Sequence, residues 1–219
     1  MDFKGLINFL NELKENNHKE WFDTHRTSYE TLRKDFIDFL NKLLADLQKM
    51  DSGLIGLEAK ACIFRINKDV RFSKDKSPYK TNFGALMNRG GKKSSYAGYY
   101  LHIDPNDIFI AGGSYQPSTE LLSSIRQEID YNLEEWKGIV EQEDVKKYFG
   151  GLNGESLVRA PKGYEIDNPA IDYLKRKNFV YMQHFRVADL NNEKFRQRIL
   201  DAYAAMKPMN DFINRCVDL

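Results

Sequence analysis

Apolar residues in the first fifty positions recur with helical spacing. They predict an amphipathic helix over residues 3–15 and a second, longer helix over 19–49. Asn16-Asn17 separates the two segments, and Asp51-Ser52-Gly53 ends the second one, so we expect an antiparallel helical hairpin. The apolar faces consist of Phe3, Leu6, Ile7, Leu10 and Leu13 in the first helix, and of Trp21, Phe22, Tyr29, Leu32, Phe36, Phe39, Leu40, Leu43, Leu44 and Leu47 in the second.

Between residues 61 and 112 the spacing of the apolar residues changes from the helical period of about 3.6 residues to the strand period of two. Segments 61–67, 81–88, 96–103 and 107–112 each read as a short strand. Asp104-Pro105-Asn106-Asp107 is a turn that joins the last two. Consecutive short strands with tight connections predict an antiparallel sheet.

The second half of the chain returns to helical patterns. We expect helices and loops over 117–176, a fifth strand over 179–187 and a last helix over 191–216, which Pro208 should kink or interrupt. The whole chain, 1–219, reads as a single α+β domain. It has an antiparallel sheet of four to five strands, with helices packed mainly on one face.

Composition limits the class of protein. The 219 residues are 42% hydrophobic with a net charge of only +1, which argues against disorder. No apolar run of about 18 residues is present, so no membrane span is expected. The charged N-terminal helix does not resemble a secretory signal, and Cys62 and Cys216 give neither a disulfide framework nor zinc spacing. A cytoplasmic protein with reduced thiols is the expectation.

Positive charge is concentrated in one segment. Residues 65–93 contain nine Lys and Arg against Asp69 and Asp75, whereas the rest of the chain has a net charge of −6. Proteins that coat long nucleic acids usually carry a wider basic surface. The pattern therefore favours a local anion site.

Familiar catalytic motifs are absent from the sequence. There is no P-loop, no G-x-G-x-x-G, no G-x-S-x-G and no H-E-x-x-H. His18 and His25 lack further ligands nearby, and Cys62 reads as a small core residue. The sequence predicts no metal site and indicates neither a cofactor nor an oligomeric state.

Several segments together resemble a known family. They are WFDTHRTSYE (21–30), FRINKDVRFSKDKSPYKTNFG (64–84), GYYLHIDP (98–105), FIAGGSYQP (109–117), IRQEID (125–130), APKGYEIDNP (160–169) and LKRKNF (174–179). The chain resembles the domain of unknown function 2461 family of mostly bacterial proteins, which implies a single-domain soluble protein and no particular substrate. It departs from the family at Lys68, where Arg is common, and at Asn168, where His is common.

The basic segment offers the donors of an anion site. Arg65, Arg71, Lys76 and Lys80 supply positive charge, while Ser73, Ser77, Tyr79 and Thr81 supply hydroxyls. This set suits a phosphate or carboxylate ligand on a small molecule. The alternative is a solvated loop whose cations pair with Asp69 and Asp75.

Strand alternation extends the predicted site onto the sheet. It places Arg65, Tyr100, His102, His184 and Arg186 on one face, with Gly112 and Gly113 at the rim. Gly84 and Gly98 would leave room for a ligand. We expect His102 to act as general acid or base if there is catalysis.

A binding protein for nucleic acid or an acidic partner, without catalysis, is the alternative function. Its stacking residues would be the aromatics among the cations: Phe72, Tyr79, Phe83, Tyr96, Tyr99 and Tyr100.

Overall fold

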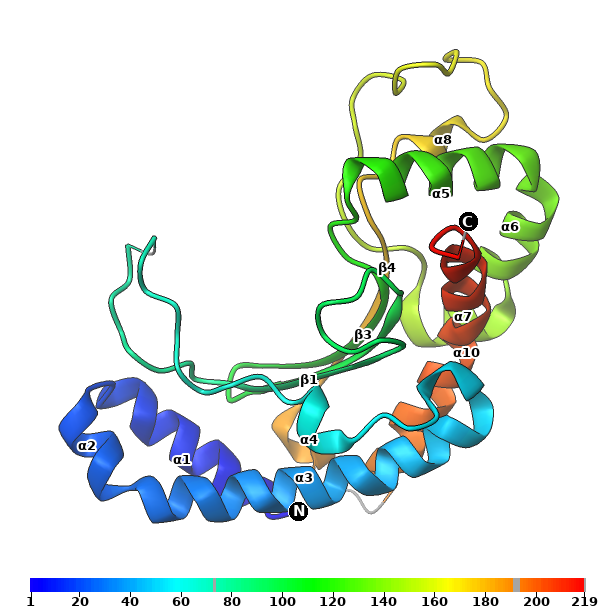
Figure 1. Cartoon of the computed structure of the whole chain (residues 1–219). Helices are drawn as coiled ribbons and strands as arrows, with labels where there is room; N and C mark the ends of the chain where they lie inside the picture. Colours follow the sequence, from blue (N-terminus) through cyan, green and yellow to red (C-terminus); the bar gives the residue numbers. More distant parts are fainter. Residues whose placement is uncertain (73, 191–193, 219) are drawn as a thin grey trace. The chain divides into compact units, whose positions relative to one another are not determined.

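The structure, a computed structural model, describes residues 1–72, 74–190 and 194–218 (Figure 1). Over these ranges the chain forms ten α-helices, one 3-10 turn and a four-stranded antiparallel sheet, which confirms the α+β class. The helices are α1 (Phe3–Glu15), α2 (Lys19–Thr24), α3 (Arg26–Met50), α4 (Ala59–Cys62), α5 (Thr119–Tyr131), α6 (Leu133–Val140), α7 (Glu143–Phe149), α8 (Ile171–Leu174), α9 (Val187–Leu190) and α10 (Phe195–Arg215). The strands are β1 (Phe83–Asn88), β2 (Gly98–Asp104), β3 (Asp107–Ser114) and β4 (Phe179–Phe185), in the sheet order β1-β2-β3-β4.

The chain divides into two compact units, each assembled from separate segments. The first unit contains Met1–Met87, Tyr100–Ile110 and His184–Leu200, and the second contains Asn88–Tyr99, Ala111–Gln183 and Asp201–Leu219. Every strand of the sheet runs from one unit into the other. The expectation of a single domain stays a prediction.

The predicted strand over 61–67 was wrong. Its first two residues belong to α4, and the remainder makes only the isolated bridges Ile63↔Ala85 and Asn67↔Tyr79. Between these bridges the chain advances four residues on one side and six on the other, so the ladder is out of register and no regular strand forms. The predicted apolar face is also broken, because Phe64 is 37% exposed.

The predicted helix over 19–49 is divided in two at His25. The His25 imidazole Nδ1 lies 2.8 Å from the Trp21 carbonyl, and the Thr24 hydroxyl donates to the same carbonyl at 2.8 Å. Side chains that bond the backbone locally compete with continuation of a helix. The consequence is a change of direction between α2 and α3.

The last helix, α10, also differs from the prediction, but here a predicted break is absent. Pro208 lies inside α10, which remains helical from Phe195 to Arg215, so the predicted interruption does not occur. Its buried neighbours Tyr203, Met206 and Met209 offset the lost backbone hydrogen bond by packing. Residues 191–193 of the predicted helix lie outside the described residues.

In the first unit the long helices cover one face of the strands, as predicted. Phe36 and Tyr29 of α3 make edge contacts with Phe83 of β1, at ring-centroid distances of 5.4 and 6.0 Å. Figure 1 shows α1 and α3 on this side, while the segment after α4 rises away from them. The face of the strands opposite α3 is therefore not part of this core.

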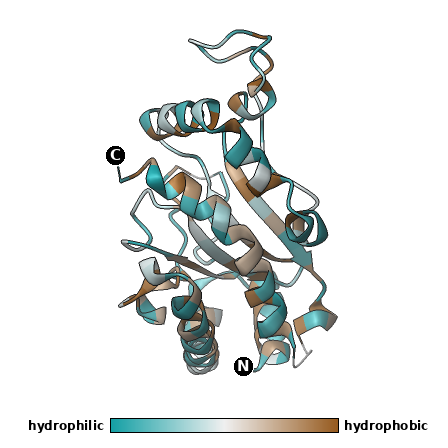
Figure 2. Ribbon diagram, turned by 90° about the vertical axis from the view of Figure 1, so that its right-hand side faces the viewer, coloured by the Kyte–Doolittle hydropathy of each residue, from teal (hydrophilic) through white to brown (hydrophobic). Residues whose placement is uncertain are grey.

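The second unit has its own core around α10. Trp136 is fully buried and meets Phe179 and Phe212 at 5.6 and 5.0 Å between ring centroids. Tyr99 of β2 packs on Tyr203 of α10 at 5.0 Å. In Figure 2 the helices carry both apolar (brown) and hydrophilic (teal) residues, as amphipathic helices do.

None of the helices in the described part of the chain combines the length and the apolar character that a membrane span requires.

Candidate functional site

A cavity of about 250 Å³ opens in the first unit between α2, α3 and the segment after α4. The cavity is lined by Phe22, Arg26, Tyr29, Arg33, Ile63, Phe64, Arg65, Ile66, Asn67 and Tyr79. We call it the arginine cavity, because three of its lining residues are arginines. Its volume suits a small ligand or a single functional group of a larger one.

Helix geometry brings two of the arginines to the same wall. Arg26, Tyr29 and Arg33 are spaced i, i+3 and i+7 in α3, so their side chains lie on one face. Arg65 comes from the opposite wall. Arg26 pairs with Asp23 at 2.6 Å, but within the described residues neither Arg33 nor Arg65 has a carboxylate within ion-pair distance. The cavity thus holds two guanidinium groups whose charge no close ion pair balances.

Aromatic rings form the apolar part of the lining. Phe22 stacks on Tyr79 with ring centroids 4.0 Å apart, and the Arg26 guanidinium lies 5.5 Å from the Phe22 centroid. Burial raises the pKa of the Tyr29 phenol, an effect that Arg33 opposes. Tyr29 therefore stays protonated at neutral pH and can donate a hydrogen bond.

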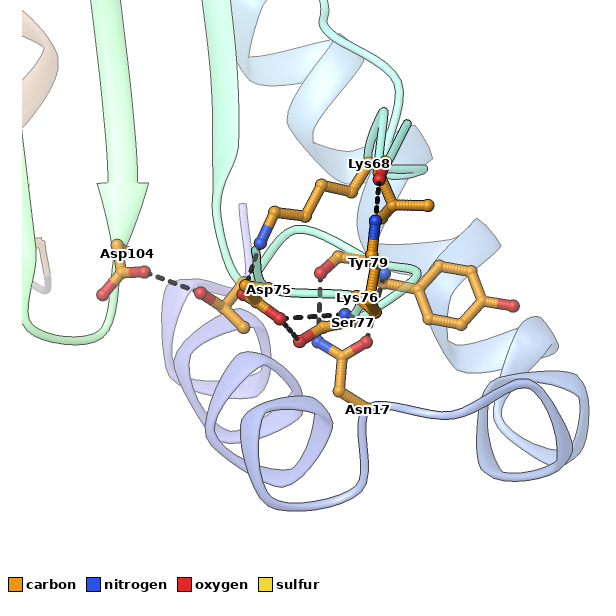
Figure 3. A network of polar contacts seen from close by, with 9 residues as sticks. Asn17, Lys68, Asp75, Lys76, Ser77, Tyr79 and Asp104 are labelled. Carbon is orange, nitrogen blue, oxygen red and sulfur yellow. Dashed lines mark hydrogen bonds and ion pairs between the residues drawn. The ribbon is translucent and has the colours of Figure 1, made fainter. Parts of the chain in front are cut away.

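A side-chain amide fixes the position of Tyr79. Asn17 donates from Nδ2 to the Tyr79 carbonyl at 3.0 Å and accepts from the Tyr79 backbone N–H at 3.1 Å (Figure 3). This pair of hydrogen bonds attaches the segment before β1 to the α1–α2 connection. It sets one wall of the arginine cavity.

The described residues 67–72 and 74–79 belong to a hairpin that we call the basic hairpin. Its base is held by Lys68 N–H donating to the Pro78 carbonyl at 2.9 Å and by the Asn67↔Tyr79 bridge. Arg71 makes two hydrogen bonds to Asp69, at 3.0 and 2.7 Å, and Lys68 pairs with Asp75 (Figure 3).

The Lys68 ammonium and the Ser77 hydroxyl hold the pKa of Asp75 far below its usual range. Lys76 donates to the Val70 carbonyl at 2.9 Å. Two cations of this hairpin, Lys68 and Arg71, thus pair with its own aspartates, as expected for a solvated loop whose charges are locally paired. Ser73 lies outside the described residues.

Tyr100 and His102 lie on the face of the strands opposite α3. The Tyr100 hydroxyl is 2.9 Å from His102 Nδ1, and the Asn82 amide nitrogen is 3.4 Å from the same atom. Burial raises the pKa of Tyr100 to about 12 and lowers the pKa of His102, although Asp104 and Asp107 oppose the second shift. The Asn82 amide nitrogen can only donate and also approaches Nδ1, so we infer that Nδ1 accepts from the Tyr100 hydroxyl and that the neutral imidazole carries its proton on Nε2.

The space above Gly84 is filled by the protein itself. A Cβ at Gly84 would lie 2.7 Å from the Tyr100 hydroxyl oxygen. This glycine therefore admits the Tyr100 side chain and does not leave room for a ligand, contrary to the sequence-based expectation.

The predicted site residues are distributed over several places. Arg65 and Tyr79 line the arginine cavity, which Tyr100 and His102 do not line. Phe64 lines the arginine cavity together with Arg65 and also contacts Tyr100, at 6.2 Å between ring centroids.

The remaining candidates have local partners. His184 Nδ1 lies 3.0 Å from Asp107, and Arg186 lies beside Asp189 at 3.6 Å. Lys80 lies 5.5 Å from the Phe64 ring centroid. Among the aromatics expected to stack on bases, Phe83, Tyr79 and Tyr99 are buried, so they do not offer a free ring face.

Gly112 and Gly113 belong to the second unit, where packing explains both glycines. A Cβ at Gly112 would lie 2.1 Å from the Met206 sulfur, and one at Gly113, whose φ is +117°, would lie 2.0 Å from the Phe179 carbonyl oxygen. Their role at a ligand stays a prediction.

Sequence reasoning missed Arg26 and Arg33. The signal was present as the i, i+3, i+7 spacing with Tyr29, inside a helix that was interpreted only by its apolar face. Within the described ranges, no group of three or more His, Cys, Asp or Glu residues is placed to hold a metal ion.

Comparison with known proteins identifies a family. A family model described as a conserved hypothetical protein (DUF2461) matches residues 5–212. No curated protein and no solved structure matches the chain.

Proposed function

The chain belongs to the DUF2461 family of conserved hypothetical proteins, and on that premise we propose that it binds a small oxyanion, a phosphate or carboxylate group, in the arginine cavity. One observation carries the proposal. Arg33 and Arg65 face a common cavity of about 250 Å³, and no described carboxylate pairs with either. Hydrogen bonds from Arg71, and to a lesser extent the positive charge of Arg65, lower the pKa of Asp69.

Arg33 and Arg65 line the same cavity, so one bound anion could accept hydrogen bonds from both guanidinium groups. Each guanidinium offers a planar fork of donors that matches two oxygens of a phosphate or carboxylate. Tyr29 and the Asn67 amide, both in the lining, can donate to the remaining oxygens.

The lining favours binding over catalysis. Its residues are Arg, Tyr, Phe, Ile and Asn, without a Ser, Cys, His, Asp or Glu to act as nucleophile or base. His102, the predicted acid or base, is not among the residues that line the cavity. We therefore propose a receptor site for an anion, with no reaction assigned to it.

Calorimetric titration with inorganic phosphate, and in parallel with acetate, tests this proposal. Arg33→Ala and Arg65→Ala should each weaken binding of the preferred anion by about tenfold or more, since hydrogen bonds to charged groups contribute about 1.5–3 kcal/mol. The control is Arg159→Ala, an exposed arginine of the second unit, which should bind normally. Unchanged affinity in both cavity variants would contradict the proposal.

A double variant, Arg71→Ala with Lys80→Ala, separates the arginine cavity from the basic hairpin. Loss of phosphate binding in this variant alone would assign the anion to the hairpin. Retention of binding supports the arginine cavity.

A further inference from the structure

A row of rings crosses the face of the strands opposite α3. Phe64, Tyr100, Phe109 and His184 follow one another with centroid distances of 6.2, 5.8 and 5.6 Å, and His102 stacks on Phe109 at 4.6 Å with an interplanar angle of 16°. All five belong to the first unit. We call this set the ring row.

The ring row is separate from the hydrophobic core. Leu101, Ile103, Ile108 and Ile110 alternate with it along β2 and β3 and are buried on the other face. Phe64 is 37% exposed, His184 is exposed, and the three rings between them are half-buried. The exposed face of an antiparallel sheet is usually polar, so a continuous row of rings there indicates a ligand with flat apolar surfaces.

The rings are held in place from within the row. Tyr100 donates to His102 Nδ1 at 2.9 Å, which fixes the imidazole plane against Phe109. His184 is held by Asp107 at 3.0 Å. Such side chains do not first have to be ordered when a ligand binds, which lowers the cost of binding.

Positive charge lies at one end of the row. Phe64 leads into the basic hairpin, and the Lys80 ammonium lies 5.5 Å from its centroid. Residues 64–80 contain six Lys and Arg against Asp69 and Asp75. Within the described chain no carboxylate pairs with Lys74 or Lys76. Negative charge lies further along the row, where Asp104 accepts from Thr81 and Asp107 is bonded to His184.

We propose that the ring row binds unpaired bases of a single-stranded nucleic acid, with the basic hairpin contacting its phosphates. Flat rings beside cations are the combination that single strands require, because each base offers a stacking face and each phosphate a charge. Bases within a duplex are already stacked and paired, and do not reach such a surface. The exposed Phe72 ring, 95% accessible and 5.8 Å from the Arg71 guanidinium, adds a stacking position on the hairpin.

The test is fluorescence anisotropy of a labelled twelve-residue thymidine strand and of a labelled duplex, in buffer of low ionic strength. We expect the single strand to bind more tightly than the duplex. Phe109→Leu, which keeps apolar volume but removes the ring, should weaken single-strand binding by about tenfold, as should Phe64→Ala. Tyr131→Ala, an exposed aromatic of α5 in the second unit, is the matched control and should bind normally.

Three outcomes would overturn the inference. The first is absence of single-strand binding at low ionic strength. The second is binding that survives both ring substitutions and the third is equal binding of strand and duplex, since either of these would reflect charge alone. Thermal unfolding of each variant verifies that it is folded. Arg33→Ala should leave strand binding unchanged. Phe64 lines the arginine cavity as well as the ring row, so Phe109→Leu is the variant that separates the two sites.

Discussion

The hydroxyl of Tyr100 donates to Nδ1 of His102 across 2.9 Å, between two side chains on the same face of β2. This contact determines which nitrogen of His102 carries the proton. It also removes Nδ1 from any proton transfer to a ligand, so only Nε2 remains for that purpose. A catalytic role for His102, which stays a prediction, would have to use Nε2.

The pKa of His102 should lie below the ordinary value of about 6.5, because burial disfavours the charged imidazole and outweighs Asp104 and Asp107. The unfolded chain then takes up the proton first as the pH falls. His102 should therefore contribute fully to stability above about pH 6.5 and progressively less below it. Denaturant unfolding of the wild type and of His102→Gln between pH 5 and 8 measures this. The prediction would be contradicted if the free energy of unfolding of the wild type increased relative to that of His102→Gln as the pH falls.

Tyr100→Phe should raise the pKa of His102, because Nδ1 loses the donor that stabilises the neutral ring. Two-dimensional NMR titration of the imidazole resonances measures the shift. Phe has nearly the same shape as Tyr, so the substitution keeps the packing against Phe64 and Phe109 and removes only the hydroxyl. An unchanged or lower pKa would show that the hydrogen bond does not set the protonation state.

Replacing Asn17 by Ala should destabilise the protein by about 1–3 kcal/mol, because both backbone groups of the nearly buried Tyr79 lose their partner. Asn16→Ala is the matched control. In the described part of the chain the Asn16 side chain bonds the Glu12 carbonyl of the helix that it follows, and the loss of this exposed contact should have a small effect. Urea unfolding of the two variants decides, and equal midpoints would contradict the importance of the Asn17 contact.

Gly113→Ala should be among the most damaging small substitutions. Its φ of +117° strains any L side chain, and the new Cβ would meet the Phe179 carbonyl, so we expect a loss of about 1–3 kcal/mol or more. Gly138→Ala in α6 serves as the comparison, since nothing lies within 4 Å of its Cβ. It should stabilise the helix by up to about 1 kcal/mol. Thermal unfolding measures both variants, and a Tm that moves in the same direction in both, relative to the wild type, would refute these two expectations.

Asp75→Asn should loosen the basic hairpin. The carboxylate holds Lys68 and both the backbone and hydroxyl of Ser77, and the Asn side chain retains neither the charge nor all the acceptors. Trypsin should then cleave faster after Arg71, Lys74 or Lys76, as peptide mapping would show. In the wild type the same loosening should appear as the pH falls below about 4, since the pKa of Asp75 is depressed and its stabilisation is lost on protonation. Trypsin is inactive at this low pH. Hydrogen exchange of the hairpin amides would therefore measure the acid-induced loosening of the wild type.

Local periodicity was sufficient for most of the secondary structure. The helix over 3–15 and the strands over 81–88, 96–103, 107–112 and 179–187 depend on residues close in sequence, and the structure confirms them within a few positions. The segment 61–67 alternates just as well, yet it is not a strand. Its pairing with 79–85 is offset by two residues, and that offset depends on the partner segment and not on its own pattern.

The site was harder to predict for a related reason. Charge density pointed to 65–80, but Lys68 and Arg71 are engaged by Asp75 and Asp69 within the same hairpin. Arg33 and Arg65 are separated by more than thirty residues and meet only because α3 packs beside the segment after α4. Convergence of this kind follows from tertiary packing, which residue spacing in one segment does not encode.

The division of every strand between two units has a consequence for synthesis on the ribosome. The first unit needs residues up to Leu200, and the second needs residues from Asp201 onward. Nascent chains emerge from the N-terminus, so α1 and α3 leave the exit tunnel long before β4 is available to complete the sheet. The first unit cannot be completed before Leu200 has emerged, nor the second before the residues after Asp201 have emerged. The two units therefore become complete at nearly the same point of synthesis, although the first segments of each are made much earlier.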